Sequence, residues 1–167
     1  VEVTDANGGV GTSAVITINE PPAMTGVTSV TSNYNGQDIS CFGACDGSVD
    51  ITAGGGTPGY VYLWDDPSAS TGTTVNGLCA GTYNVTITDF NNCLLVVPVT
   101  ITEPTALANN ITSNNASCFG VCDGDATANT SGGTAPYSFQ WDDPSLQTTQ
   151  TATGLCAGTY NVVITDA

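Results

Sequence analysis

The chain has 167 residues with fifteen Asp plus Glu and no Lys, Arg or His, so its formal net charge is −15. Without imidazole, ammonium or guanidinium groups it cannot build a Ser-His-Asp triad or a Schiff base. It also cannot neutralise the phosphates of nucleic acid or attract anionic lipid. Every carboxylate must therefore be solvated, accept hydrogen bonds or bind a cation.

The remaining composition favours an all-β fold. Thr occurs 27 times and Gly 20 times. β-branched residues favour pleated strands, whereas Gly and Asn favour the turns between them. No apolar stretch approaches the length of a membrane span, so we expect no direct membrane insertion.

The chain contains an internal repeat. Cys41-Phe-Gly-Ala-Cys-Asp-Gly47 returns 77 residues later as Cys118-Phe-Gly-Val-Cys-Asp-Gly124, and 29 of 49 positions are identical between 41–89 and 118–166. Other matches have offsets of 83 and 84 residues, so the period is about 77–84. A repeat of this length is a full domain with its own core, unlike the shorter units of solenoids.

The repeat divides the chain into three parts. Val3-Thr-Asp5 matches Ile87-Thr-Asp89, so we interpret residues 1–22 as the C-terminal strands of a preceding repeat. Residues 23–104 form a complete repeat. Residues 105–167 form a third repeat that lacks its last strand.

Comparison of the copies predicts which side chains point inward. Tyr60-Val-Tyr-Leu-Trp64 is ambiguous alone, but its counterpart Tyr137-Ser-Phe-Gln-Trp141 alternates clearly between apolar and polar residues. Pro98 lies outward in the last strand and indicates a sheet edge. The other residues predicted to point inward are Val49, Ile51 and Ala53; Tyr83, Val85 and Ile87; and Val97, Val99 and Ile101.

Six or seven short strands with regular turn signals predict tandem immunoglobulin-like β-sandwich modules. Trp64 and Trp141 occupy the third strand, where such sandwiches bury an indole. Tyr83 and Tyr160 stand at the entry to the sixth strand, where a tyrosine corner bonds its hydroxyl back to the backbone.

The ordered motifs resemble the SprB-type repeats of large surface proteins of gliding Bacteroidota. The matching features are the Cys-Phe-Gly-x-Cys-Asp-Gly run, Gly55-Gly-Thr-Pro-x-Tyr60, Leu78-x-Ala-Gly-Thr-Tyr83 and the closing Ile-Thr-Glu-Pro. This resemblance implies an extracellular, multi-repeat, adhesin-like protein of the cell surface. It also implies export by the type 9 secretion system and a link to gliding or attachment.

Disulfides are favoured over metal sites for the cysteines, because an extracellular module of about 80 residues gains stability from crosslinks. Without His, no Cys/His zinc pattern is available. One alternative is a four-cysteine zinc site in each module, made by Cys41, Cys45, Cys79 and Cys93.

Strand directions suggest the pairing. The second and sixth strands of an immunoglobulin-type sandwich run parallel, so the cysteines preceding them lie at one pole. We therefore expect Cys45–Cys79 and Cys122–Cys156. By elimination we also expect Cys41–Cys93, although Cys93 begins a strand at the other pole and a disulfide spans only about 5.5–6 Å between Cα atoms.

The alternative for Cys41 is a bond to the last-strand cysteine of the next module.

Paired carboxylates are the other candidate chemistry. Asp65-Asp66 and Asp142-Asp143 have the composition of a glycosidase pair, but adjacent strand residues point apart, and Asp-Asp-Pro is typical of turns. We therefore expect no enzymatic activity and no organic cofactor. Oxygen ligands at a module junction suit Ca²⁺, and the candidate ligands are Asp46, Asp65, Asp66 and Asp166.

The sequence thus predicts a non-catalytic stalk whose partners are neighbouring repeats of the same chain. Pro104 stiffens the short junction, and strands of about eight residues make each module about 30 Å long. One alternative is a module that binds glycan or another surface polysaccharide. Another is a filament subunit that accepts a strand from a neighbour.

Overall fold

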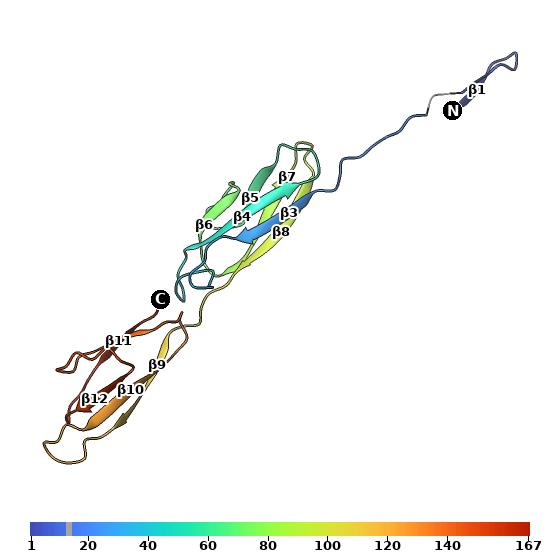
Figure 1. Cartoon of the computed structure of the whole chain (residues 1–167). Coiled ribbons are helices and arrows are strands. Elements are labelled where there is room, and N and C mark those ends of the chain that lie inside the picture. Colours follow the sequence, from blue (N-terminus) through green and yellow to red (C-terminus); the bar gives the residue numbers. More distant parts are fainter. Residues whose placement is uncertain (13–14) are drawn as a thin grey trace.

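The computed structural model describes residues 1–12 and 15–167. Figure 1 shows a hairpin, an extended segment and two β-sandwiches lying end to end. Every regular element among the described residues is a β-strand, which confirms the all-β class. In chain order the strands are β1 (Glu2–Thr4), β2 (Val10–Thr12), β3 (Thr25–Val30), β4 (Gly47–Gly54), β5 (Val61–Trp64), β6 (Thr74–Leu78), β7 (Gly81–Thr88), β8 (Leu94–Ile101), β9 (Ala108–Asn114), β10 (Gly124–Ser131), β11 (Ser138–Trp141), β12 (Thr151–Leu155) and β13 (Val162–Thr165).

The first sandwich consists of two three-stranded antiparallel sheets, β3-β4-β6 and β5-β7-β8. An immunoglobulin-type sandwich places strands A, B and E in one sheet and C, F and G in the other. Strands β3 to β8 take the places of A, B, C, E, F and G in chain order. The sheet order is therefore that of an immunoglobulin-type sandwich.

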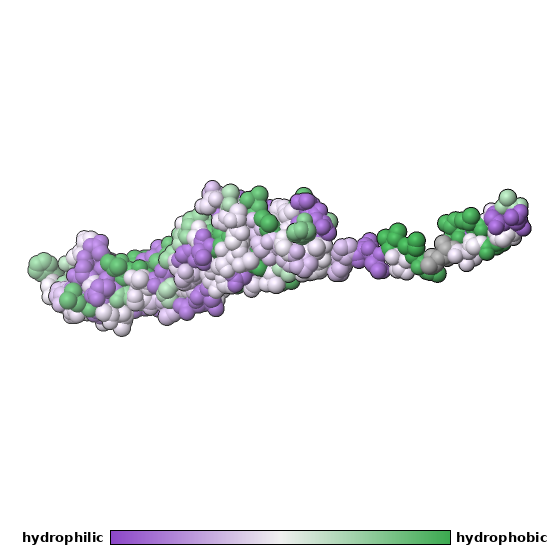
Figure 2. Space-filling view, turned by 90° about the horizontal axis from the view of Figure 1, so that it is seen from above, coloured by the Kyte–Doolittle hydropathy of each residue, from purple (hydrophilic) through white to green (hydrophobic). Residues whose placement is uncertain are grey.

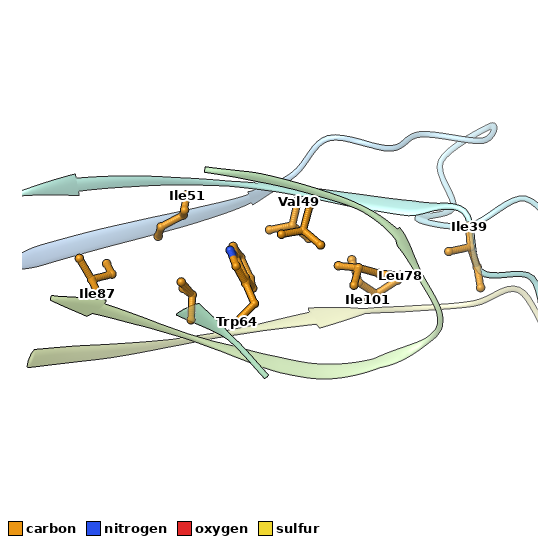
Figure 3. Packing of buried hydrophobic residues seen from close by; sticks show 9 residues of the cluster. Ile39, Val49, Ile51, Trp64, Leu78, Ile87 and Ile101 are labelled. Atoms are coloured by element: carbon orange, nitrogen blue, oxygen red, sulfur yellow. The ribbon is translucent and has the colours of Figure 1, made fainter. Parts of the chain in front are cut away.

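Alternating side chains of both sheets form the core of this sandwich. Val49 and Ile51 on β4 face Val85 and Ile87 on β7, and Trp64 lies between the sheets with 1% of its surface exposed. Figure 3 shows this packing. Branched side chains suit such a pleated, enclosed surface. The buried cluster comprises Ile39, Val49, Ile51, Trp64, Val75, Leu78, Val85, Ile87 and Ile101.

The second sandwich has the sheets β12-β10-β9 and β11-β13, which correspond to β6-β4-β3 and to the β5-β7 pair of the first. Its core is smaller, partly because alanines replace branched residues and partly because Val162 and Ile164 are less buried than their counterparts Val85 and Ile87. Ala126, Ala128 and Ala152 stand where the first sandwich has Val49, Ile51 and Val75, and they pack around Trp141 and Leu155. Less apolar surface is therefore removed from water, and we expect this sandwich to be the less stable one.

The N-terminal hairpin has the register of the β7–β8 hairpin. Val3 pairs with Gly11 in the hairpin, just as Ile87 pairs with Leu95. All described residues from 1 to 23 are exposed, and Figure 1 shows the hairpin away from the first sandwich.

Each sandwich is hydrogen-bonded to the segment that precedes its first strand. The backbone N–H of Gly133 donates to the carbonyl of Thr105 at 2.7 Å. Gly132 has φ +73°, and a Cβ there would lie 2.1 Å from the Ala106 carbonyl oxygen, so only glycine fits. Equivalent contacts in the first sandwich involve Pro22, Ala23, Gly55 and Gly56.

Candidate functional site

A disulfide joins the two sheets at one pole of each sandwich. Strands β4 and β7 run in the same direction, so the residues preceding them lie together, and Cys45 is bonded to Cys79. The same arrangement bonds Cys122 to Cys156 in the second sandwich. These are the pairs that the strand directions suggested.

The expected Cys41–Cys93 bond is wrong. Cys41, Cys93 and Cys118 are free and exposed. Cys41 precedes β4 at the disulfide pole, whereas Cys93 precedes β8 at the opposite pole. The eight-residue strand β8 spans about 26 Å, far more than a disulfide can bridge. A four-cysteine zinc site fails for the same reason.

A tyrosine supports the disulfide in each sandwich. The Tyr83 hydroxyl donates to the carbonyl of Cys79 at 3.1 Å, and the Tyr160 hydroxyl donates to Cys156 at 3.2 Å. Both tyrosines are half-buried, and each packs against the core of its sandwich. The half-cystine is therefore held by a covalent bond and by a hydrogen bond to its own backbone.

The two tryptophans anchor the loop after β5 and its counterpart after β11. The Trp64 indole N–H donates to the carbonyl of Gly72 at 3.0 Å, and the Trp141 indole donates to Thr149 at 2.9 Å. Each indole thus fills the core and satisfies its only polar group, as a buried tryptophan requires.

The paired carboxylates are structural groups of the turns. Asp66 accepts hydrogen bonds from the backbone amides of Ser68 and Ser70 at 3.1 and 2.7 Å. Burial raises its pKa, but these bonds outweigh burial and leave the pKa below its usual value. Asp65 instead accepts two bonds from Asn84, whose backbone amide is the main cause of its lowered pKa.

The second sandwich repeats this arrangement. Asp143, only 2% exposed, accepts bonds from the amides of Gln147 and Ser145. Asp142 accepts two bonds from Asn161. Because the lone pairs of both carboxylates are occupied by the protein, they are poorly suited to glycoside hydrolysis.

Asp89 organises the hairpin at the opposite pole. Its carboxylate accepts the backbone amides of Thr57, Asn91 and Cys93 at 2.9, 2.9 and 2.8 Å. The Thr57 and Cys93 amides are the largest causes of its lowered pKa. Asp5 accepts two amides in the N-terminal hairpin in the same way. Backbone N–H groups therefore donate the hydrogen bonds that cationic side chains supply to carboxylates in other proteins.

The four carboxylates considered for Ca²⁺ do not form a site. Asp46 accepts the amide of Ser40, and Asp166 accepts the amide of Thr134. Asp65 is bonded to Asn84 of β7, and Asp66 is bonded to its own turn. Within residues 1–12 and 15–167, no three His, Cys, Asp or Glu residues converge as metal ligands. The sequence predicted Asp46, Asp65 and Asp66 at one pole and Asp166 at the facing pole of the neighbouring repeat, but each carboxylate is bonded within its own sandwich.

Two exposed features went unnoticed in the sequence. Phe42 and Phe119 occupy equivalent places in the loops before β4 and β10, and both are exposed. The repeated Cys-Phe-Gly-x-Cys run was the signal that could have identified them. The outer face of the β5-β7-β8 sheet also carries an apolar patch formed by Val61, Leu63, Leu94 and Val96. Figure 2 shows apolar surface along the molecule.

Comparison with known families gives two matches within the chain. Residues 33–69 and 110–146 each match the family model described as "SprB repeat". These ranges contain the loop before β4 or β10, the strand itself, and the turn that holds the buried aspartate. No curated protein matches the chain. In the described part of the chain, no helix has the length and apolarity needed to cross a membrane.

Proposed function

Because this chain contains two SprB repeats, we propose that it is a non-catalytic segment of the stalk of a large bacterial surface adhesin. The repeats would act as semi-rigid spacers that carry a distal function away from the cell. Export by the type 9 secretion system and a role in attachment or gliding belong to this proposal. The disulfides support an extracellular location.

The strongest support for this proposal comes from the junction between the two sandwiches. Asp38 accepts the amide of Thr102, and Glu103 accepts the amide of Gly43, both at 2.8 Å. These bonds hold the exit strand to the first sandwich, whereas Thr105 is bonded to the second. Only Pro104 lies between the two attachments. It is buried, and its ring fixes φ.

In this junction only the rigid Pro104 lies between residues that are bonded to one sandwich or the other. Such a junction favours a rod over modules joined by a flexible linker. The repeated disulfide also suits a stalk under load, because it limits how far each module can be extended. Cys45 and Cys79 are 34 residues apart, and their bond shields this loop from extension.

Force spectroscopy tests the stalk proposal. In a polyprotein of tandem copies pulled from its ends, unfolding of a crosslinked module should leave the 34-residue loop closed. Reduction should add about 110–120 Å of contour length per module. The paired variant Cys45→Ser/Cys79→Ser should show the longer extension without reductant, and Cys41→Ser should not. Modules that unfold at negligible force in the oxidised state would contradict a load-bearing role.

A second candidate function is binding of a surface glycan or polymer. The equivalent exposure of Phe42 and Phe119 favours it, because aromatic rings that repeat along a stalk could stack on successive sugars. A glycan array probed with the wild-type chain and with Phe42→Ala/Phe119→Ala tests this candidate. Retained binding in the variant, or no binding by either protein, would exclude these rings as the site.

A further inference from the structure

The outer face of the β5-β7-β8 sheet carries a compact apolar patch. It consists of Val61 and Leu63 on β5 and of Leu94 and Val96 on β8, and all four side chains are more than half exposed. The strands run along the long axis of the sandwich (Figure 1), so the patch lies on its side and not at the poles where repeats join. Single exposed apolar residues are common on protein surfaces, whereas a contiguous patch marks an interaction site.

The fold does not require apolar residues at these positions. In the second sandwich, β11 corresponds to β5, and Ser138 and Gln140 stand in the places of Val61 and Leu63. Both polar residues are exposed. Strand propensity accounts for an outward valine but not for an outward leucine, which is not β-branched. The apolar side chains of the first sandwich therefore indicate a surface that contacts a partner.

The strand registers place the four side chains of the patch at the corners of a rectangle, with two threonines of β7 between them. One row across the sheet consists of Val61, Thr88 and Leu94, and the next row consists of Leu63, Thr86 and Val96. The two leucines therefore occupy one diagonal of the rectangle, and the two valines occupy the other.

This diagonal arrangement is complementary to itself. When two such sheets face each other, a two-fold axis through the centre of the patch exchanges either the two outer strands or the two rows. In both orientations each leucine of one copy faces a valine of the other. Facing positions that combine a large side chain with a small one interdigitate well. A patch that fits its own copy is what the isologous interface of a two-fold dimer requires.

Charge also favours a second copy of the chain as the partner. Two copies with a net charge of −15 repel each other wherever their carboxylates meet. Among the residues that point outward from β5, β7 and β8, none is Asp or Glu. Two copies can therefore approach through this face without opposing carboxylates on these strands. A basic partner, in contrast, finds no carboxylate on these strands with which to pair.

We infer that two copies of this chain associate side by side through the outer faces of their β5-β7-β8 sheets. Three strands of up to eight residues cover about 27 Å by about 14 Å, so two such faces in contact bury about 750 Å² in total. Stable dimers bury about 1,200–2,000 Å², so this dimer is weak and forms only at high local concentration. The inference does not depend on the proposed stalk function.

Cysteine crosslinking tests which face is used. In a background with Cys41→Ser, Cys93→Ser and Cys118→Ser, the variant Thr86→Cys places one thiol near the centre of the patch. Facing sheets lie about 10 Å apart, so a short bismaleimide should join two copies into a covalent dimer. Thr52→Cys, exposed on the opposite sheet, is the matched control and should remain monomeric. No dimer with Thr86→Cys, or an equal yield with Thr52→Cys, would overturn the inference.

Sedimentation velocity of the full chain tests the contact without crosslinks. We expect dimers that increase with protein concentration and with ionic strength, because salt screens the repulsion between the copies. The variant Val61→Ser/Leu63→Gln introduces the residues that the second sandwich has at these positions, so it should fold normally and lose the dimer. Val27→Ser removes a valine that is 67% exposed on the opposite sheet, and it should dimerise like wild type.

A chain that remains monomeric near millimolar concentration and at high salt would contradict the inference. So would dimers that persist in Val61→Ser/Leu63→Gln, because another surface would then hold them together. These results leave the stalk proposal untouched, since force spectroscopy tests it separately.

Discussion

The carboxylate of Glu103 accepts a hydrogen bond from the backbone N–H of Gly43 at 2.8 Å. This contact attaches the segment leaving the first sandwich to the loop that precedes β4. The same segment reaches the second sandwich two residues later, through Thr105. The direction in which one repeat leads to the next is therefore fixed by contacts within the first repeat.

Loss of this contact should loosen the junction. Glu103→Ala removes the acceptor and leaves both sandwiches intact, so we expect a wider range of inter-sandwich orientations without a change in melting temperature. Small-angle X-ray scattering should show a broader pair-distance distribution. Glu20→Ala, the equivalent substitution in the exposed N-terminal segment, is the matched control and should leave the scattering unchanged. Identical curves for wild type and Glu103→Ala would show that the bond does not orient the modules.

Removal of the first disulfide should lower stability substantially. The bond closes a 34-residue loop, and crosslinks of this kind stabilise small domains by about 2–4 kcal/mol. Urea denaturation of Cys45→Ala/Cys79→Ala should show that loss for the first sandwich. Cys41→Ser/Cys93→Ser changes two exposed free thiols and should stay within about 0.5 kcal/mol of wild type. A large loss in this control would show that these thiols have a structural role.

The tyrosine corner should contribute less to the free energy of unfolding than the disulfide. Tyr83→Phe removes only the hydroxyl that donates to Cys79, and a hydrogen bond of this kind contributes about 0.5–1.5 kcal/mol to stability. Tyr62→Phe, at a half-buried position on β5, serves as the comparison. Equal free energies of unfolding for wild type and Tyr83→Phe would show that this hydrogen bond does not stabilise the fold.

Acid should weaken the fold through its structural aspartates. A carboxylate whose pKa is lower in the folded chain contributes stability that is complete above the unfolded pKa of about 3.9. This stability is lost as the pH falls through the lowered folded value. The aspartates with a lowered pKa are Asp46, Asp65, Asp66, Asp89, Asp123, Asp142 and Asp143.

The variant Asp66→Asn isolates this effect. Its melting temperature should lie below that of wild type at pH 7, and the difference should narrow between pH 4 and pH 2 as Asp66 itself becomes protonated. Glu2→Gln, on the exposed strand β1, should follow the wild-type curve throughout. A constant difference between Asp66→Asn and wild type down to pH 2 would show that geometry, and not charge, explains the loss.

Local patterns in the sequence were enough to predict the strands and their inward faces. Alternation identified Val49, Ile51 and Trp64 as core residues, because a half-buried strand has a period of two. Strand direction placed Cys45 beside Cys79. These features depend on one strand or one pair of strands, so the repeat comparison could identify them.

Features that depend on several segments at once were not predictable in this way. Cys41 and Cys93 were paired by elimination, although the strand directions already separated them. Asp46, Asp65 and Asp66 were grouped at one pole, with Asp166 at the facing pole of the neighbouring repeat, but side-chain direction and nearby amides decided their roles. Phe42 was overlooked because a residue type alone does not reveal whether a loop side chain packs inward.

A distance distribution across the junction shows directly whether the two repeats are held in one relative orientation. Spin labels at Thr52 and Ser138, both exposed, can be introduced as cysteines after replacement of the three free thiols. Pulsed dipolar spectroscopy should give one narrow peak, which Pro104→Gly with two added glycines should broaden. A broad distribution in the wild-type chain would contradict the semi-rigid stalk, because it would mean that the two repeats move independently.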